Sequence, residues 1–134
     1  MTIRHHLSDP LLMAYAAAQL PEAFSLVVAT HVSLCDDCRA RLASFEAVGG
    51  AVLDEAEEIA LGEDALAQTL ARIERLPQEP APKPAPRSGV FPGPLADYVG
   101  GDLDAVRWRR VGGGVRQAIL PTGKGATVRL LHIP

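Results

Sequence analysis

Three residues with metal-binding side chains lie close together in the first half of the chain: His31, Cys35 and Cys38. The spacing His-x3-Cys-x2-Cys places an imidazole and two thiols within eight residues. Zinc prefers four tetrahedral nitrogen or sulfur ligands, and His5 and His6 each offer an imidazole upstream as the fourth. The sequence therefore predicts one zinc ion in a closed, structural site, because no position is left open for a catalytic water.

Each half of this pattern has another interpretation when it is taken alone. A Cys-x2-Cys pair in a reducing compartment can be a redox pair, and a His-His pair near a terminus is often a surface feature. The conjunction favours zinc, because a helical domain of 76 residues in a chain with 4% aromatic residues has a small core that a metal would stabilise. The order His, His, Cys, Cys also differs from that of DNA-reading zinc fingers.

Helices are expected to position these ligands. Asp9 is the expected N-cap of a first helix that has Pro10 in its first turn and runs towards Leu20. A second helix is expected to begin at Pro21, because apolar side chains then recur at helical spacing. The stripe that should face the core ends at the candidate ligand and consists of Phe24, Val27, Val28 and His31.

Two further helices are expected before residue 76. The third follows Cys35, with Asp36 and Asp37 in its first turn, and Gly49-Gly50 should interrupt or end it. Its apolar positions are Leu42, Phe45 and Val48. The fourth helix carries an apolar stripe that either packs on the other helices or forms part of a partner-binding face. This stripe consists of Leu66, Leu70 and Ile73.

Charge and composition divide the chain into three parts. Residues 1–76 carry five arginines against twelve acids, a net charge of −7, which disfavours direct nucleic-acid binding. Residues 77–94 contain seven prolines in eighteen residues and are expected to form an extended linker. Residues 95–134 change to a strand-like period, with turn-forming residues at Gly112–Gly114 and Pro121–Gly125.

The expected fold is therefore mainly α, with about four helices followed by an incomplete β segment. Its three strands are expected at Val106–Val111, Val115–Leu120 and Ala126–Ile133, with no helix beside them. No apolar run approaches the roughly 20 residues that span a bilayer, and no signal peptide is recognisable, so a cytoplasmic protein without a membrane association is expected. No nucleophile-base pair, paired carboxylates or phosphate loop stands out, so an enzyme is not expected.

Residues 1–76, with His6 and then His31-x3-Cys35-x2-Cys38 on short helices, resemble the zinc-binding anti-sigma factors. The linker and the second half resemble the ChrR type, in which a cupin barrel follows the anti-sigma domain. The segments that carry this second resemblance are Leu95–Val99, Val106–Trp108 and Gly112–Pro121. The resemblance implies that the zinc ligands are His6, His31, Cys35 and Cys38.

The resemblance also implies a function. Such a protein binds an extracytoplasmic-function sigma factor, in a 1:1 complex, and keeps it from RNA polymerase during a singlet-oxygen or oxidative stress response. An alternative is a zinc-thiol switch in which oxidation of Cys35 and Cys38 controls partner binding. The cupin His-x-His motif should follow the third strand, and the chain reaches Pro134 before it, so a truncated cupin-like domain is expected. His132, alone on a strand, is expected to be a surface or packing residue.

Overall fold

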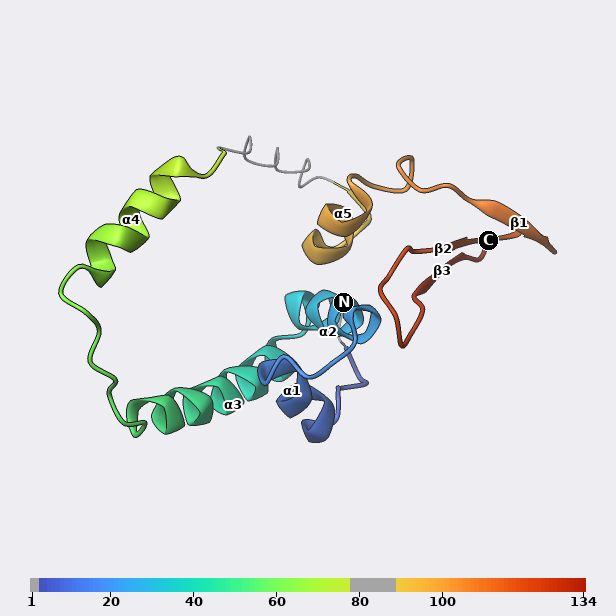
Figure 1. The fold of residues 1–134 in the computed structure, drawn as a ribbon. Coiled ribbons are helices and arrows are strands. Elements are labelled where there is room, and N and C mark those ends of the chain that lie inside the picture. Colours follow the sequence, from blue (N-terminus) through green and yellow to red (C-terminus); the bar gives the residue numbers. More distant parts are fainter. Residues whose placement is uncertain (1–2, 78–88) are drawn as a thin grey trace.

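The computed structural model describes residues 3–77 and 89–134. Three helices form a bundle in the first half, a fourth helix stands apart from it, and a fifth helix and a small sheet follow in the second half (Figure 1). The elements are α1 (Asp9–Ala16), α2 (Glu22–Leu34), α3 (Asp36–Asp54), α4 (Ala65–Arg75), α5 (Gly93–Val99), β1 (Arg109–Gly112), β2 (Val115–Ile119) and β3 (Arg129–His132). The predicted architecture, mainly α with a partial β segment, is confirmed.

The core of the bundle has one buried side chain from each helix: Leu12, Val28 and Leu42. Partly buried apolar side chains surround these three, namely Leu7, Leu11, Tyr15, Leu20, Val32 and Phe45. Leu7 precedes α1, so the N-terminal segment is also held against the bundle. This placement brings the residues around His6 close to the junction of α2 and α3.

Two expectations for the first helices were wrong. The N-cap of α1 is Ser8, and Asp9 lies inside the first turn, where its carboxylate pairs with Arg41. The stripe on α2 was half wrong, since Phe24 and Val27 are exposed, whereas Val28 is buried in the core and His31 is half-buried. The buried face of α2 consists of Ala23, Leu26 and Val28. Apolar residues occur around most of this helix, so periodicity alone could not select the face that packs on α1 and α3.

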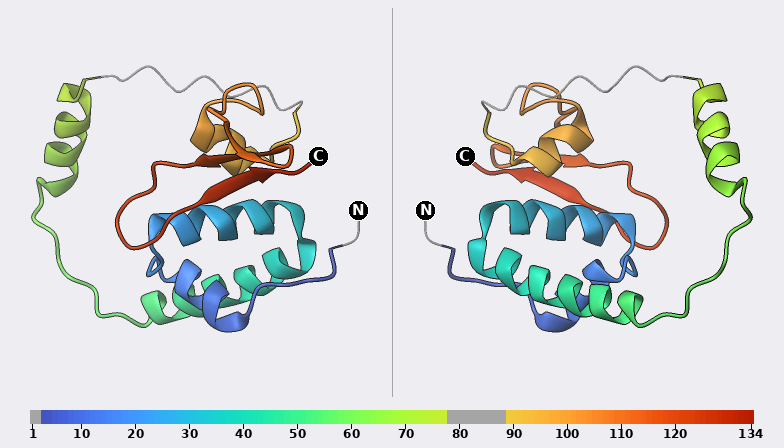
Figure 2. Two further views of the ribbon diagram at one scale, coloured as in Figure 1. Left: turned by 90° about the vertical axis from the view of Figure 1, so that its right-hand side faces the viewer. Right: turned by 90° about the vertical axis from the view of Figure 1, so that its left-hand side faces the viewer.

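The third helix also differs from expectation, whereas the fourth forms around the predicted stripe of Leu66, Leu70 and Ile73. The α3 helix continues through Gly49-Gly50, because two glycines cost about 2 kcal/mol of helix propensity without forcing the helix to end. Val48 is exposed, beyond the reach of the shorter α1. No other helix or strand in the described part of the chain packs against α4, and both views in Figure 2 show it separated from the bundle.

The second half contains a helix that was not expected. The α5 helix begins at Gly93 with Pro94 in its first turn, inside the segment interpreted as linker, and ends at Gly100, which has a left-handed backbone with φ of 76°. Proline is favourable in a first turn, where its missing N–H group has no partner to lose. Most of the predicted linker, residues 78–88, lies outside the described residues.

The three predicted strands form one antiparallel sheet in the order β1-β2-β3. A turn at Gly113-Gly114 joins the first two, and residues 120–128 join the second to the third. His132 packs against Trp108, with ring centroids 6.0 Å apart and planes at 70°, which confirms a packing role for this histidine. Among the described residues, no helix is long and apolar enough to cross a membrane.

Candidate metal centre

The four predicted ligands come from the segment before α1 and from the junction of α2 and α3. His6 lies in the segment before α1, His31 in the last turn of α2, and Cys38 in the first turn of α3. Cys35 is both the C-cap of α2 and the N-cap of α3, with an extended backbone at φ −113° and ψ 106°. One ligand therefore forms the corner between the two helices that carry its neighbours.

The structure brings one ligand atom of each residue into a single cluster. The imidazole nitrogens of His6 and His31 and the thiol sulfurs of Cys35 and Cys38 lie within 4.8 Å of one another. His5 does not belong to this cluster, so the geometry favours His6 over its neighbour. Both cysteines are buried and free, His31 is half-buried, and His6 is on the solvent side.

The distances from His6 to the two sulfurs match a tetrahedral site. Zinc–sulfur bonds of about 2.3 Å and zinc–nitrogen bonds of about 2.0 Å place neighbouring sulfur and nitrogen ligands about 3.5 Å apart. The Nδ1 atom of His6 lies 3.3 Å from the Cys35 sulfur and 3.7 Å from the Cys38 sulfur. These two separations bracket the expected value, so His6 already stands at ligand spacing from both sulfurs.

A second observation points to a missing partner at the same place. The Nε2 atom of His31 is buried and has no hydrogen-bond partner among the described residues. Buried polar nitrogens nearly always have a partner, because leaving one without costs free energy. A cation bound by this nitrogen would satisfy it, so the donor set and the burial both fit a metal ion.

The electrostatics of Cys38 support the need for positive charge. Burial raises the pKa of its thiol most, and the N–H group of Leu7, which donates to the sulfur at 3.3 Å, lowers it. Neighbouring Cys35 raises the pKa further, while the charge of Arg41 lowers it. Two buried thiolates are unfavourable side by side, and a divalent cation between them would remove that penalty.

Sequence reasoning missed the contacts that hold His6 in place. Arg41 on α3 donates from Nη1 to the carbonyl oxygen of Leu7 at 3.0 Å and also pairs with Asp9. On its other side, the His6 Nε2 atom lies 3.8 Å from the carboxylate of Asp37. Carboxylates commonly orient metal-binding histidines through the second ring nitrogen. No spacing rule could have found these partners, because Arg41 and Leu7 are 34 residues apart.

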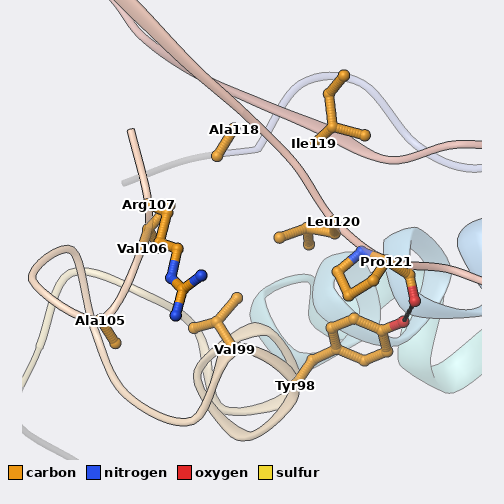
Figure 3. Close-up of a pocket in the computed structure, with 9 residues that line it drawn as sticks. All are labelled: Tyr98, Val99, Ala105, Val106, Arg107, Ala118, Ile119, Leu120 and Pro121. Carbon is orange, nitrogen blue, oxygen red and sulfur yellow. Dashed lines mark hydrogen bonds between the residues drawn. The ribbon is translucent and has the colours of Figure 1, made fainter. Parts of the chain in front are cut away.

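A pocket lies away from this cluster, between α5 and β2. It is an open pocket of about 250 Å³ with apolar walls that include Val99, Ala118 and Leu120, and Arg107 is its only charged lining residue (Figure 3). The lining contains no acid–base pair and no group of metal ligands. The fold and the cluster therefore define a helical protein with a site that can hold a metal ion and an attached antiparallel segment.

Comparisons with known proteins agree with this description. The chain is 60% identical over 136 residues to the anti-sigma-E factor ChrR of Cereibacter sphaeroides, covering all of this chain and 62% of the relative. It also matches a chain in the crystal structure of Rhodobacter sphaeroides SigE in complex with the anti-sigma ChrR. That match has 57% identity and a TM-score of 0.81, and covers 99% of this chain and 67% of the other.

The chain belongs to the family of ChrR-type anti-sigma factors. It spans 62% of the length of the curated relative. No protein-family model matches it. The cluster of two histidines and two cysteines is a site that can hold a metal ion.

Proposed function

We propose that the chain binds and sequesters an extracytoplasmic-function sigma factor in a 1:1 complex and so prevents its use by RNA polymerase. The observation that carries the proposal is the likeness over 99% of the chain to a ChrR protein solved in complex with SigE. The role is that of an interaction protein acting in the cytoplasm, without a catalytic step, without direct nucleic-acid contact and without a membrane association. Control by singlet oxygen or oxidative stress belongs to the same proposal.

The metal is proposed to be zinc, held by His6, His31, Cys35 and Cys38. Two thiolates and two imidazoles form a complete tetrahedral set, and a closed zinc site supplies folding free energy rather than chemistry. Of these residues, Cys35 joins the two helices and His6 ties the N-terminal segment to them. Zinc would therefore fix how the bundle presents its surface.

The partner-binding face is proposed to include α4. This helix has no buried residue, and its three apolar side chains Leu66, Leu70 and Ile73 are 71%, 51% and 54% exposed. They recur at i, i+4 and i+7, which is the pattern of a helix that packs its apolar side into a groove. The net charge of −7 in residues 1–76 favours a partner with basic rims around that groove.

The division of labour follows the domain boundaries. Residues 1–76 are proposed to form the sigma-binding zinc domain, residues 77–94 the linker, and residues 95–134 a segment resembling the start of a cupin barrel.

The thiol-switch alternative uses the same Cys35 and Cys38, but both are buried, and buried thiols react slowly with oxidants. Zinc would have to leave before a disulfide could form.

Mixing the purified chain with a candidate sigma factor tests the proposal. A stoichiometric complex that blocks sigma-dependent transcription is expected, with about one zinc per chain. Leu70→Ala is expected to weaken the complex, and Met13→Ala serves as a control, because Met13 is exposed on α1. Failure of the chain to bind any sigma factor of this class would contradict the proposal, and loss of binding on oxidation alone would favour the thiol switch.

A further inference from the structure

The first turn of α2 holds the second half of the chain through one carboxylate. Glu22 accepts a hydrogen bond from the Tyr98 hydroxyl at 2.9 Å through Oε1, and the N–H group of Gly123 donates to its Oε2. The two donors come from α5 and from the loop between β2 and β3, 76 and 101 residues away in sequence. Contacts of this range are the ones that bind separate segments into one unit.

The Tyr98 hydroxyl also contacts the backbone of the loop that follows β2. It lies 3.2 Å from the carbonyl oxygen of Pro121, the contact that the dashed line marks in Figure 3. Partial burial raises the pKa of Tyr98 most, and the hydrogen bond to the Glu22 carboxylate and its charge raise it further, so the neutral donor form is the stable one. Glu22, Tyr98 and Gly123 are called the latch below.

The backbone around the latch is fitted closely to α2. The Cβ of any residue other than glycine at position 123 would lie 2.9 Å from the Glu22 carboxylate. At Gly125 an added Cβ would lie 3.7 Å from Pro21, the N-cap of α2. The α5 helix also packs against α2, and Figure 1 shows α5 above α2. The latch is therefore the polar part of a wider contact.

The opposite end of the same helix carries the candidate metal ligand. The α2 helix runs for 13 residues from Glu22 in its first turn to His31 in its last, and Cys35 caps it. A helix of about 13 residues is only marginally stable in isolation. Contacts at one end of α2 therefore stabilise the whole helix, including the turn that the site at its other end needs. Two sites that stabilise one shared ordered element are coupled, and the coupling acts equally in both directions.

We propose that the latch docks residues 89–134 onto the first turn of α2 and that this docking strengthens metal binding at the last turn of the same helix. The metal half of this inference rests on the proposed zinc site, whereas the docking half does not. A change in the second half of the chain would then reach the zinc site through α2, without any direct contact between the two.

The test uses the full chain and the substitution Tyr98→Phe, which removes the hydroxyl and keeps the ring. The control is Tyr15→Phe, which removes the same hydroxyl from a tyrosine of the α1–α3 core. Hydrogen exchange of the Gly123 amide is measured by NMR, and zinc affinity by competition with a chromophoric chelator. A second variant, Glu22→Gln, keeps the shape of the acceptor and removes its charge.

Tyr98→Phe and Glu22→Gln are each expected to speed exchange at Gly123 by about 3- to 10-fold, the factor for one lost hydrogen bond. The double variant should show less than the product of the two factors, because the substitutions remove one shared contact. The zinc dissociation constant is expected to rise several-fold in the double variant and to stay unchanged in Tyr15→Phe.

Each result separates the two parts of the inference. Unchanged exchange at Gly123 in Tyr98→Phe would overturn the latch, whether or not zinc binds. Faster exchange with an unchanged zinc dissociation constant in the double variant would overturn the coupling. A chain that binds no zinc would overturn the proposed zinc site and the coupling together, while the exchange measurement would still report on docking.

Discussion

Replacing Leu12 by alanine should make the folding of the bundle depend on zinc. The Leu12 side chain has no solvent exposure and belongs to the core cluster with Val28 of α2 and Leu42 of α3. Truncating a leucine in such a position costs about 3–5 kcal/mol. A domain of this size has a free energy of unfolding of about 4–11 kcal/mol at 0.05–0.15 kcal/mol per residue. Leu12→Ala therefore removes roughly half of the stability that the bundle has.

Urea unfolding followed by far-ultraviolet circular dichroism, with zinc and with a chelator, measures this effect. With chelator, Leu12→Ala should be largely unfolded before urea is added, whereas zinc should restore a cooperative transition, because metal binding contributes to folding. The control is Leu66→Ala, the same chemical change at a side chain that is 71% exposed on α4, where a change within about 0.5 kcal/mol is expected.

The pair of leucines also separates folding from partner binding. Leu66→Ala should weaken the complex with the sigma factor while leaving the unfolding curve in place, and zinc-loaded Leu12→Ala should bind normally. Equal shifts in the unfolding curves of both variants would refute the assignment of core and partner face. So would a Leu12→Ala variant that is as stable as the unsubstituted chain in the presence of chelator.

Three further results are expected. Cys38→Ser should lower the zinc content well below one equivalent by metal analysis, since it removes a ligand that is fully buried; full occupancy would argue against this ligand set. The pKa of Asp102 is lowered below its ordinary value of 3.8, chiefly by the hydrogen bond from the N–H group of Val90. The stability that the Asp102 carboxylate contributes is therefore complete above the unfolded pKa of 3.8. It is lost as the pH falls through the lower pKa of the folded state. Acid titration of Trp108 fluorescence should show this loss, and Asp102→Asn should remove it. Gly49→Ala should stabilise α3 by about 0.5–1 kcal/mol, because an added Cβ meets nothing within 4 Å.

The sequence determined the candidate site better than it determined the faces of the helices. Ligand types and spacing are local, so His31, Cys35 and Cys38 could be chosen from sequence alone. Residue types and spacing left both His5 and His6 as candidates for the upstream ligand. The choice between them depends on how Arg41 holds the N-terminal segment against α3. That contact depends on the folded chain and has no pattern in the sequence.

The errors in the fold have a common physical reason. Apolar periodicity identifies a helix but not its buried side when small and large apolar residues surround it, as on α2. Glycine lowers helix propensity by an amount that neighbouring turns can offset, so α3 passes through Gly49. Proline was read as a helix breaker at Pro94, although in the first turn of α5 it is favourable.

Because Cys35 caps both α2 and α3, no loop residue separates the helices that carry His31 and Cys38. One inserted residue between them would rotate the following ligand by about 100° around the helix axis and remove it from the cluster. Residues 17–21, between α1 and α2, lie outside both helices, so length changes there leave each ligand on its own turn. Distant sequences with the same site should therefore keep the seven-residue interval from His31 to Cys38 and vary freely in the distance to the first histidine.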